Sequence, residues 1–570
     1  MIAVPKLSDS RRLTGANLYW QQPAAIIDCA GEGDLGPFIG LWQDAVERLL
    51  SLLDRAESET TVRTFDGGAS LLISAPVDAL YSMCEVNEVA FAQAQALAAG
   101  ADLESLDDDL ERLRQEFAEE ANPPLLALQA EAKRQGVPFL WDDDAVSVGY
   151  GATALVWTPD ALPATDEVPW AEVGTIPVAL VTGTNGKSTT VRMAAAILSA
   201  AGLRAGLTST DWIRVGENIL DTGDYSGTGG ARTLLRHPDT QIAVLETARG
   251  GMLRRGLGVD SASGALITNV AADHLGDYGI NTVPELIEAK FIVRRALQGE
   301  APLLLNADDA GVVAFSESLD QPLGWFSLEA GHPLVEAQRA SAGPGAFLRD
   351  GELVLLEHGT DRPLMRADEI PAALEGAARH NIANALAAAL LCQVLGIDLR
   401  HIREGLAAFR GDAGDNPGRN NWFEKDGVRI LVDFAHNEHG MLALADMLRR
   451  VPAERRFMLM SQAGDRLDGD IRDMTRAACG ISPDRLFLCD LPGYERGRAP
   501  GEVIQVIRSA ALSSGVAENQ ISEWPNPRAA VAAALDAARP GDLLVLFVLT
   551  QRDEVLSMIH HYLDGDAAGR

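Results

Sequence analysis

The sequence predicts a multidomain α/β protein with a phosphate-binding loop in its central domain. The chain has 570 residues, which exceeds the size of one ordinary hydrophobic core. Short apolar runs such as residues 176–182 alternate with alanine-rich stretches such as residues 189–202, a pattern typical of βαβ units in a parallel sheet. A glycine-rich loop, VTGTNGKSTT, joins these two segments. Together the three observations place a phosphate-binding α/β domain in the middle of the chain.

Two segments rich in proline, glycine and acidic residues divide the chain. They read PDALPATDEVPW and GDAGDNPGR, and both discourage packed structure. We therefore expect four parts: an α+β N-terminal domain over residues 1–158, a linker over 159–170, a central P-loop domain over 171–410 and a Rossmann-like C-terminal domain over 411–570.

Within these parts the pattern predicts individual elements. Residues 101–117 read as a solvent-facing helix, and residues 147–157 read as a strand broken by a glycine turn. Residues 380–396 read as a helix. In the C-terminal domain we expect strands over 428–435, 456–462, 485–491 and 542–549, with a helix over 528–541 before the last strand, as in a doubly wound sheet.

Charge and apolar segments exclude several classes of protein. A formal net charge of −33 argues against nucleic acid as a partner, because neutralising its phosphates requires clustered Lys and Arg. The longest clean apolar run, residues 543–549, is too short to span a bilayer, so we expect no membrane partner. The N-terminus shows no secretory signal, and the five cysteines lack metal-ligand spacing. These features favour the cytoplasm.

The loop from Gly183 to Gly186 has the chemistry of a phosphate cradle. Its glycines let the backbone approach phosphate oxygens, and the helix expected to open at Lys187 offers free N–H groups. The Lys187 side chain adds positive charge, and the Ser188 hydroxyl can ligate magnesium. Val181 stands where the complete Walker pattern has its first glycine, so the loop is a variant of that pattern.

The motif GTNGKST after an apolar strand resembles the ATP-binding loop of the Mur ligases. Further motifs follow in the order that this family shows: LETARGGMLRRGL with Glu246, TNVAADHLGDYG with His274, and EAKFIVRRAL with Lys290. Two later segments, ARHNIANALAAALL and PGRNNWFEKDGVRILVDFAHNEHG, complete the match. The resemblance implies ATP and Mg2+ as cofactors, bound between the central and C-terminal domains.

The resemblance also implies a role for each matched residue. Ser188 and Glu246 would hold one magnesium ion, and His274 with a carbamylated Lys290 would hold a second near the substrate carboxylate. Arg419 would stabilise the γ-phosphate charge, which suits the rigid fork of a guanidinium. The implied catalytic residues are Lys187, Glu246, His274, Lys290 and Arg419. The implied nucleotide-binding residues are Gly183, Thr184, Asn185, Gly186, Lys187, Ser188, Thr189, Asn384 for adenine, Arg419, Asp433 for ribose, and His436.

Within this superfamily the chain resembles the cyanophycin synthetases most, through PGRNNWFEKDGVRILVDFAHN, AGDRLDGDIRDM and, near the N-terminus, RRLTGANLYW. In those enzymes an ATP-grasp module precedes the Mur module, whereas here GYGATALVW runs almost directly into the linker. The resemblance implies an ATP-dependent carbon–nitrogen ligase that activates an acidic acceptor and couples it to an amino acid. Arginine and an aspartate side chain form the leading pair. A separate ATP-grasp enzyme and a homo-oligomer are candidate partners.

Several questions stay open at this point. A cell-wall or folate-type Mur ligase and a non-catalytic ATP-binding partner of a separate ligase are the alternatives. The base that deprotonates the amine is not identified, with Glu246, Asp273 and His274 as candidates. Two charged segments are either substrate contacts or surface ion pairs; they contain Asp465, Arg466 and Asp470, and Arg496, Arg498 and Glu502.

Overall fold

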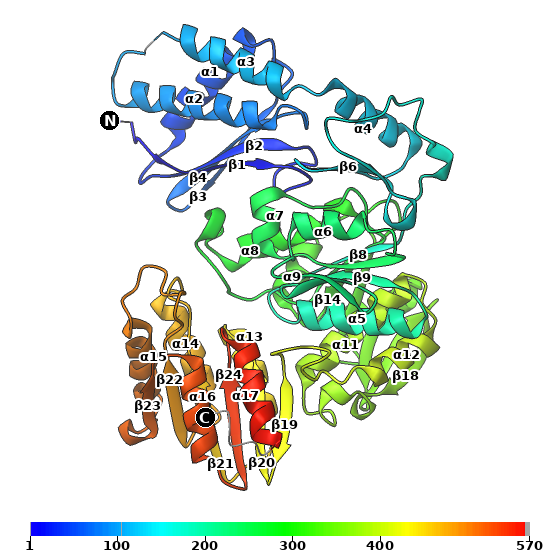
Figure 1. The fold of residues 1–570 in the computed structure, drawn as a ribbon, viewed down its shortest axis with the longest axis vertical. Helices are drawn as coiled ribbons and strands as arrows, with labels where there is room; N and C mark the ends of the chain where they lie inside the picture. The colour runs from blue at the N-terminus through cyan, green and yellow to red at the C-terminus, as the bar shows by residue number, and fades with distance from the viewer. Residues whose placement is uncertain (1, 104, 565–570) are drawn as a thin grey trace.

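The computed structural model describes residues 2–103 and 105–564, and these residues form four β-sheets. Figure 1 shows the N-terminal segment at one end, the central segment in the middle and the C-terminal segment beside the other end. No helix in the described part of the chain is long and apolar enough to cross a membrane. Helices lie between the strands along the chain, which confirms the predicted multidomain α/β class.

The N-terminal region combines an antiparallel sheet with packed helices. Its elements are β1 (Lys6–Leu13), β2 (Ala24–Ala30), α1 (Gly36–Leu52), β3 (Thr60–Phe65), β4 (Gly68–Ser74), α2 (Leu80–Ala98), α3 (Asp107–Glu120), α4 (Pro123–Gln135), β5 (Phe139–Trp141), β6 (Val146–Val148) and β7 (Leu155–Trp157). The larger sheet has the order β1-β2-β4-β3, and β5-β6-β7 form a small second sheet. Phe38, Trp42 and Phe91 of α1 and α2 fill the core beneath the larger sheet.

The central region is built on an eleven-stranded sheet. Its elements are β8 (Val178–Thr182), α5 (Lys187–Ala200), β9 (Ala205–Thr208), β10 (Trp212–Val215), β11 (Asn218–Thr222), α6 (Thr228–Leu235), β12 (Ile242–Glu246), α7 (Arg249–Arg255), β13 (Gly264–Ile267), α8 (Val283–Lys290), β14 (Leu303–Asn306), α9 (Ala310–Ser316), β15 (Leu323–Ser327), α10 (Pro333–Ser341), β16 (Gly345–Arg349), β17 (Glu352–Glu357), β18 (Thr360–Arg366), α11 (Arg379–Val394) and α12 (Leu399–Ala408). The strand order is β11-β10-β9-β12-β8-β13-β14-β15-β16-β17-β18.

Seven of these strands, from β9 to β16 in the sheet, run parallel, and antiparallel hairpins extend both ends. Alternate residues of β8 enter different cores: Val178 and Leu180 pack with α6, α7 and α8, and Ala179 and Val181 pack with α5, α11 and α12. Burial on both faces explains why the β8 sequence VALVT is almost wholly apolar. The phosphate loop therefore starts from a strand that is buried on both faces.

The C-terminal region is a doubly wound sheet. Its elements are β19 (Asn421–Lys425), β20 (Val428–Asp433), α13 (Glu438–Arg449), β21 (Arg455–Met460), α14 (Asp468–Cys479), β22 (Arg485–Cys489), α15 (Glu502–Ser513), β23 (Ile521–Trp524), α16 (Pro527–Ala537), β24 (Asp542–Phe547) and α17 (Arg552–Asp564). The order is β19-β20-β24-β21-β22-β23; β19 pairs with β20 in antiparallel orientation, and all other pairs of neighbouring strands are parallel. One core holds α13, α14 and α15, and the other holds α16 and α17.

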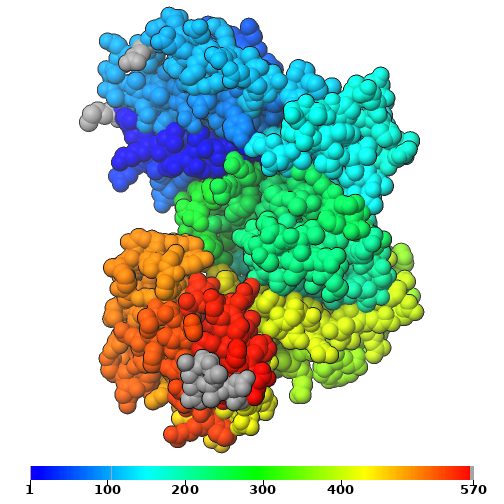
Figure 2. Space-filling view, in the orientation of Figure 1, coloured from blue at the N-terminus to red at the C-terminus, as the bar shows by residue number. Residues whose placement is uncertain are grey.

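The space-filling view shows where these regions meet. On this face the surface is hollowed between the orange part of the C-terminal region and the blue and green segments above it (Figure 2). The central and C-terminal regions nevertheless touch directly, through the hydrogen bonds and ion pairs described below. The phosphate loop lies at this junction.

Candidate nucleotide and ligation site

The site begins at the carboxyl ends of three adjacent parallel strands. β8 lies between β12 and β13, so the phosphate loop after Thr182 lies between Glu246 and Thr268. The chain places β9 and β12 on one side of β8 and β13 and β14 on the other. Such a reversal of strand order leaves a crevice outside the strand ends, where open α/β sheets bind their ligands.

Two glycines give the phosphate loop its shape. Gly183 has a φ of 145° and Gly186 a φ of 84°, both in the region that favours glycine. A Cβ atom on Gly183 would lie 1.9 Å from Thr268 Oγ1, and one on Gly186 would lie 2.2 Å from Asn384 Oδ1. The Thr268 hydroxyl donates to Asn185 O at 2.6 Å. These contacts fix the loop at the N-terminus of α5, whose first N–H groups have no partner within the helix.

We expect Gly186→Ala to abolish nucleotide binding, measured by titration with a fluorescent ADP analogue. The new methyl group would displace Asn384, and a left-handed alanine costs about 1–2 kcal/mol in addition. Gly202→Ala is the matched control, because Gly202 ends the α5 turn with a φ of 76° but has nothing within 4 Å of an added Cβ atom. Wild-type affinity in Gly186→Ala would show that the loop does not bind the nucleotide.

The first residues of α5 contact both the phosphate loop and the segment that leads into the C-terminal sheet. Lys187 Nζ donates to Thr184 O at 3.0 Å, so its ammonium group lies over the loop. Thr189 Oγ1 accepts a hydrogen bond of 3.1 Å from Asn416 Nδ2, which belongs to the segment leading into the C-terminal sheet. Helix α5, which begins with Lys187, Ser188 and Thr189, therefore contacts the segment that leads into the C-terminal domain.

Ser188 and Glu246 form a buried pair of oxygen ligands. Ser188 Oγ donates to Glu246 Oε2 at 2.8 Å, and Glu246 is 2% exposed. Its other oxygen, Oε1, has no hydrogen-bond partner within the described residues. A buried carboxylate oxygen without a donor is unfavourable, and Mg2+ prefers hydroxyl and carboxylate oxygens. The chemistry of the pair therefore fits the magnesium ion that the family resemblance implies there.

Lys290 lies directly beneath the phosphate loop. It is the last residue of α8, is 4% exposed, and donates from Nζ to Gly183 O at 2.8 Å. Burial lowers the pKa of Lys290 well below its usual value, and the charge of Lys187 lowers it further. A neutral amine is the form that can be carbamylated, so this environment suits the expected modification.

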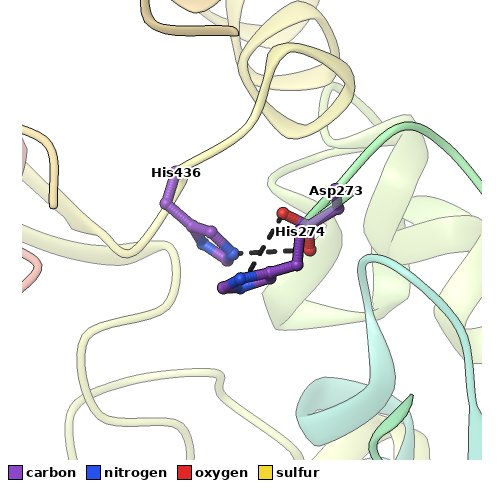
Figure 3. A group of neighbouring side chains, drawn as sticks. All are labelled: Asp273, His274 and His436. Atoms are coloured by element: carbon purple, nitrogen blue, oxygen red, sulfur yellow. Dashed lines mark ion pairs between the residues drawn. The ribbon is translucent and has the colours of Figure 1, made fainter. Parts of the chain in front are cut away.

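A second group of side chains meets where the two domains face each other. Asp273 and His274 lie on the loop after β13, and His436 lies on the loop after β20 (Figure 3). The Asp273 carboxylate is 3.8 Å from His436 Nε2 and 4.0 Å from His274 Nε2. Arg466, 8% exposed, donates to Asp273 Oδ1 at 2.7 Å and to His274 Nε2 at 3.0 Å. Asp273, His274 and His436 are spaced so that they can hold a metal ion.

The environment of this group sets its charges. Burial is the main cause that lowers the pKa of His274 to about 4. The charges of Arg466 and His436 lower it further, and the charge of Asp273 opposes these effects without reversing them. Burial alone would raise the pKa of Asp273, but the hydrogen bond and charge of His436 and the charge of Arg466 hold it well below its usual value. At neutral pH the site thus presents a neutral His274 ring beside an ionised carboxylate.

The structure does not join all predicted metal ligands. Within residues 2–103 and 105–564 no hydrogen bond or ion pair links His274 to Lys290, although the charge of Asp273 acts on both. Ser188 and Glu246 are hydrogen-bonded to each other, and in the described part of the chain no hydrogen bond or ion pair joins either of them to His274.

Arg419 reaches from the C-terminal domain to the central domain. Its Nη2 donates to Thr210 Oγ1 at 2.8 Å and lies 3.7 Å from Asp211 Oδ2. The Asp211 side chain, 7% exposed, also pairs with Arg192 of α5 and with Arg552 at the start of α17. One carboxylate thus holds three guanidinium groups from both domains.

The charges in this cluster are unbalanced. Burial lowers the pKa of Arg192 to about 10, and the charge of Arg419 adds to the effect. Burial would raise the pKa of Asp211, but Arg419 and Arg192 outweigh it and lower the pKa. Asp211 therefore stays ionised, and the excess positive charge beside α5 suits an anionic ligand.

The remaining predicted nucleotide residues lie around the same junction. Asp433 ends β20 and accepts hydrogen bonds of 2.7 Å from the backbone of Asn420 and of Ala435, and burial raises its pKa to about 6. Asn384 of α11 lies against Gly186. Asn185 and Asn437 exchange two amide hydrogen bonds of 3.1 Å, so the phosphate loop touches the residue that caps α13.

Some residues at the junction were not assigned from the sequence. Asp211, Arg192 and Asn416 belong to no recognised motif, although Arg192 follows Lys187 by five residues on α5. Arg466 is buried at the site rather than paired on the surface, and Arg498 supports it by donating to Arg466 O at 2.6 Å. Ion pairs also form between these segments and within them, Arg496 with Asp465 and Arg498 with Glu502. Asp470 and Glu502 lie on the helices that follow these loops, α14 and α15.

Comparison with known proteins supports the family resemblance that the sequence motifs indicate. The Mur ligase middle domain model matches residues 181–392, and the model of the Mur ligase glutamate ligase domain matches residues 418–547. Cyanophycin synthetases of Crocosphaera subtropica and Synechocystis sp. are 34% and 35% identical over 375 and 374 residues, which is 65% of this chain. The chain matches only 42% of the length of each of these relatives.

Other relatives are more distant. A UDP-N-acetylmuramyl-tripeptide synthetase of Leifsonia xyli subsp. xyli is 27% identical over 380 residues, 64% of this chain and 69% of that protein. Among solved structures, E. coli FolC in complex with DHPP and ADP has a TM-score of 0.49 at 18% identity, covering 67% of this chain and 88% of that one. Two models of one family, in the expected order, together match more than half of the residues, and the chain belongs to the Mur ligase family.

Proposed function

We propose that the chain is an ATP-dependent amide ligase, which activates a carboxylate as an acyl phosphate and couples it to an amine. The observation that carries the proposal is that cationic and oxygen-bearing side chains of two domains lie at the phosphate loop and beside its helix α5. They are Lys187 and the Ser188–Glu246 pair from the central domain, and Arg419 from the C-terminal domain, whose partner Asp211 also pairs with Arg192 of α5. Phosphoryl transfer between two anions needs such convergence, because positioning and charge neutralisation supply most of its catalysis.

The reaction would proceed in two steps. An oxygen of the acceptor carboxylate attacks the γ-phosphorus of ATP, the bond to the β-phosphate oxygen breaks, and ADP leaves. Lys187 and Arg419 spread the charge that develops on the phosphoryl oxygens. A neutral amine then attacks the acyl carbon, inorganic phosphate leaves with the acceptor oxygen, and the amine loses a proton as the amide forms. Magnesium held by Ser188 and Glu246 would neutralise phosphate oxygens during the first step.

The remaining predicted residues receive roles from their positions. Asn384 would contact adenine and Asp433 the ribose hydroxyls, with His436 on the loop that follows. We place the acceptor carboxylate near Arg466 and His274, because a buried guanidinium offers two parallel donors to a carboxylate. Lys290, as a carbamate, would act with His274 on the same side of the site. Glu246, Asp273 and His274 are the candidates for the base that takes the proton of the amine.

The substrates are proposed from the curated relatives. The two cyanophycin synthetases at 34% and 35% identity support arginine as the amine and an aspartate side chain as the acceptor. A partner with an ATP-grasp module would supply the acidic acceptor, and the reaction would take place in the cytoplasm. The synthetase of Leifsonia xyli subsp. xyli, at 27% identity, supports a cell-wall type ligase as the second candidate.

A matrix of acidic acceptors and amino acids tests the proposal, with ADP release and product mass as the measurements. We expect ADP release that requires both substrates, first of all arginine with an aspartate-rich peptide, and a product heavier by one arginine residue. Activity only with a cell-wall nucleotide precursor would favour the second candidate. Nucleotide binding without ADP release for any pair would favour a non-catalytic partner of another ligase.

A further inference from the structure

The loop that carries Asp273 and His274 has an unusual backbone. His274 has a φ of 51° and Tyr278 a φ of 54°, and Gly276 and Gly279 are also in the left-handed region. A residue other than glycine costs on the order of 1 kcal/mol or more in this conformation and keeps it only where the surroundings fix it. Contacts from the rest of the molecule must therefore fix this loop.

One side of the loop rests on the central domain. Arg249, at the start of α7, donates to His274 O and pairs with Asp277 at 2.8 Å. Thr282 caps α8 in a reciprocal pair with Glu285. These contacts hold the two ends of the segment, but they leave Tyr278 and Gly279 between them.

The N-terminal domain holds the other side. Arg63 of β3 donates to Gly279 O at 2.9 Å and pairs with Glu285 at 3.0 Å. The ring of Phe65 lies against Gly279, since a Cβ atom there would be 2.5 Å from two of its carbons. Alternate residues of a strand share a face, so Arg63 and Phe65 point to the loop and Thr64 points away from it.

Two further contacts come from the same sheet. Asn281 Nδ2 donates to Asp66 O at 3.0 Å, in the turn between β3 and β4. The guanidinium of Arg11 lies 4.8 Å from the centre of the Tyr278 ring, and its buried ion pair with Asp28, at 2.6 Å, holds it in place. The N-terminal sheet thus contacts the loop at Tyr278, Gly279 and Asn281.

We propose that Arg63 and Phe65 are positioning residues for the ligation site: the β3–β4 hairpin of the N-terminal domain holds residues 273–282 in the strained conformation that presents Asp273 and His274. Among the described residues, the side chain of Arg63 bonds to Gly279 and Glu285 and the ring of Phe65 lies against Gly279, and no hydrogen bond or ion pair joins either side chain to the phosphate loop. They act on the reaction only through the loop. The expected effect on kcat rests on the proposed ligase function, whereas the expected effect on the conformation of the loop does not.

The test compares Arg63→Ala and Phe65→Ala with Thr64→Ala, an exposed neighbour on the opposite face of the same strand. Hydrogen–deuterium exchange followed by mass spectrometry measures the protection of residues 273–282. Steady-state kinetics measure kcat and the KM for ATP. We expect about tenfold faster exchange in the loop and a kcat lower by a factor of about 10–100, with the KM for ATP within about twofold, because misplacement of reacting groups by about 1 Å has such an effect.

The outcomes separate the two claims. Unchanged loop exchange in both alanine variants overturns the positioning role, and so does a loss of kcat that Thr64→Ala shares. Should Arg63→Ala unfold the N-terminal domain, seen as a lower Tm and exchange throughout β1–β4, Phe65→Ala decides alone. A wild-type protein that never releases ADP contradicts the ligase function, whereas faster loop exchange in the variants would still support the positioning role.

Discussion

Lys187→Ala should abolish the ADP formation that depends on acceptor and amine. The ammonium group lies over the phosphate loop, 3.0 Å from Thr184 O, where it can contact the transferred phosphoryl group. Loss of one preorganised positive group from such a site costs about 10²–10³ in kcat. The fold should persist, because removal of this side chain leaves only a backbone carbonyl of the loop without its donor. The measurement is coupled-assay ADP release at saturating ATP.

Lys133→Ala is the matched control for this variant. Lys133 is also a helical lysine, in the last turn of α4, but it is exposed on the N-terminal domain far along the chain from the loop. It should keep wild-type kcat and Tm. Full activity in Lys187→Ala would contradict the assignment of the loop to phosphoryl transfer.

Asp211→Asn should lower both activity and stability. The substitution removes the carboxylate that Arg192, Arg419 and Arg552 share. It leaves their guanidinium groups beside one another, with Arg552 still paired to Asp553 at 3.2 Å. Removing one partner of a buried ion pair costs about 3–5 kcal/mol of folding stability. Arg419 would also lose one of the contacts that orient it for its proposed role at the γ-phosphate, so kcat should fall by about 100-fold. Calorimetry and ADP release measure the two effects.

The sign of the Asp211 effect follows from its pKa. The neighbouring arginines lower the folded-state pKa of Asp211 below its unfolded value, so its contribution to stability is present above the unfolded pKa and lost as the pH falls through the folded one. Asp239→Asn is the control, since Asp239 pairs with Arg204 at 3.5 Å with both side chains more than half exposed. Equal Tm and kcat in Asp211→Asn and Asp239→Asn would refute the role of the cluster.

Much of the fold could be predicted because strands buried on both faces are apolar. The runs at 176–182, 456–462, 485–491 and 542–549 became β8, β21, β22 and β24, each within a few residues of the predicted ends. The helix predicted over 528–541 ends at Ala537, because Pro540 and Gly541 cannot continue it. The helix predicted over 101–117 begins at Asp107 instead, where three aspartates favour the first turn; residue 104 lies outside the described residues.

The ends of the central sheet could not be predicted. β10 and β11 are short and partly exposed, and β18 contains Pro363, so none has the apolar pattern of a buried strand. The domain boundaries at residues 158, 170 and 410 and the assigned roles of the site residues stay predictions. Motif order indicated which residues would meet, but the pairing of Asp211 with three arginines and of Arg466 with Asp273 depends on how two domains face each other.

Transfer of a labelled oxygen tests the central claim most directly. The acceptor is prepared with ¹⁸O in its carboxylate and incubated with ATP, Mg2+ and the amine, and the inorganic phosphate is analysed by mass spectrometry. An acyl phosphate intermediate requires that one acceptor oxygen leaves with the phosphate, so each amide formed should yield one ¹⁸O-labelled phosphate. Unlabelled phosphate, or pyrophosphate with AMP in place of ADP, would contradict the proposed reaction.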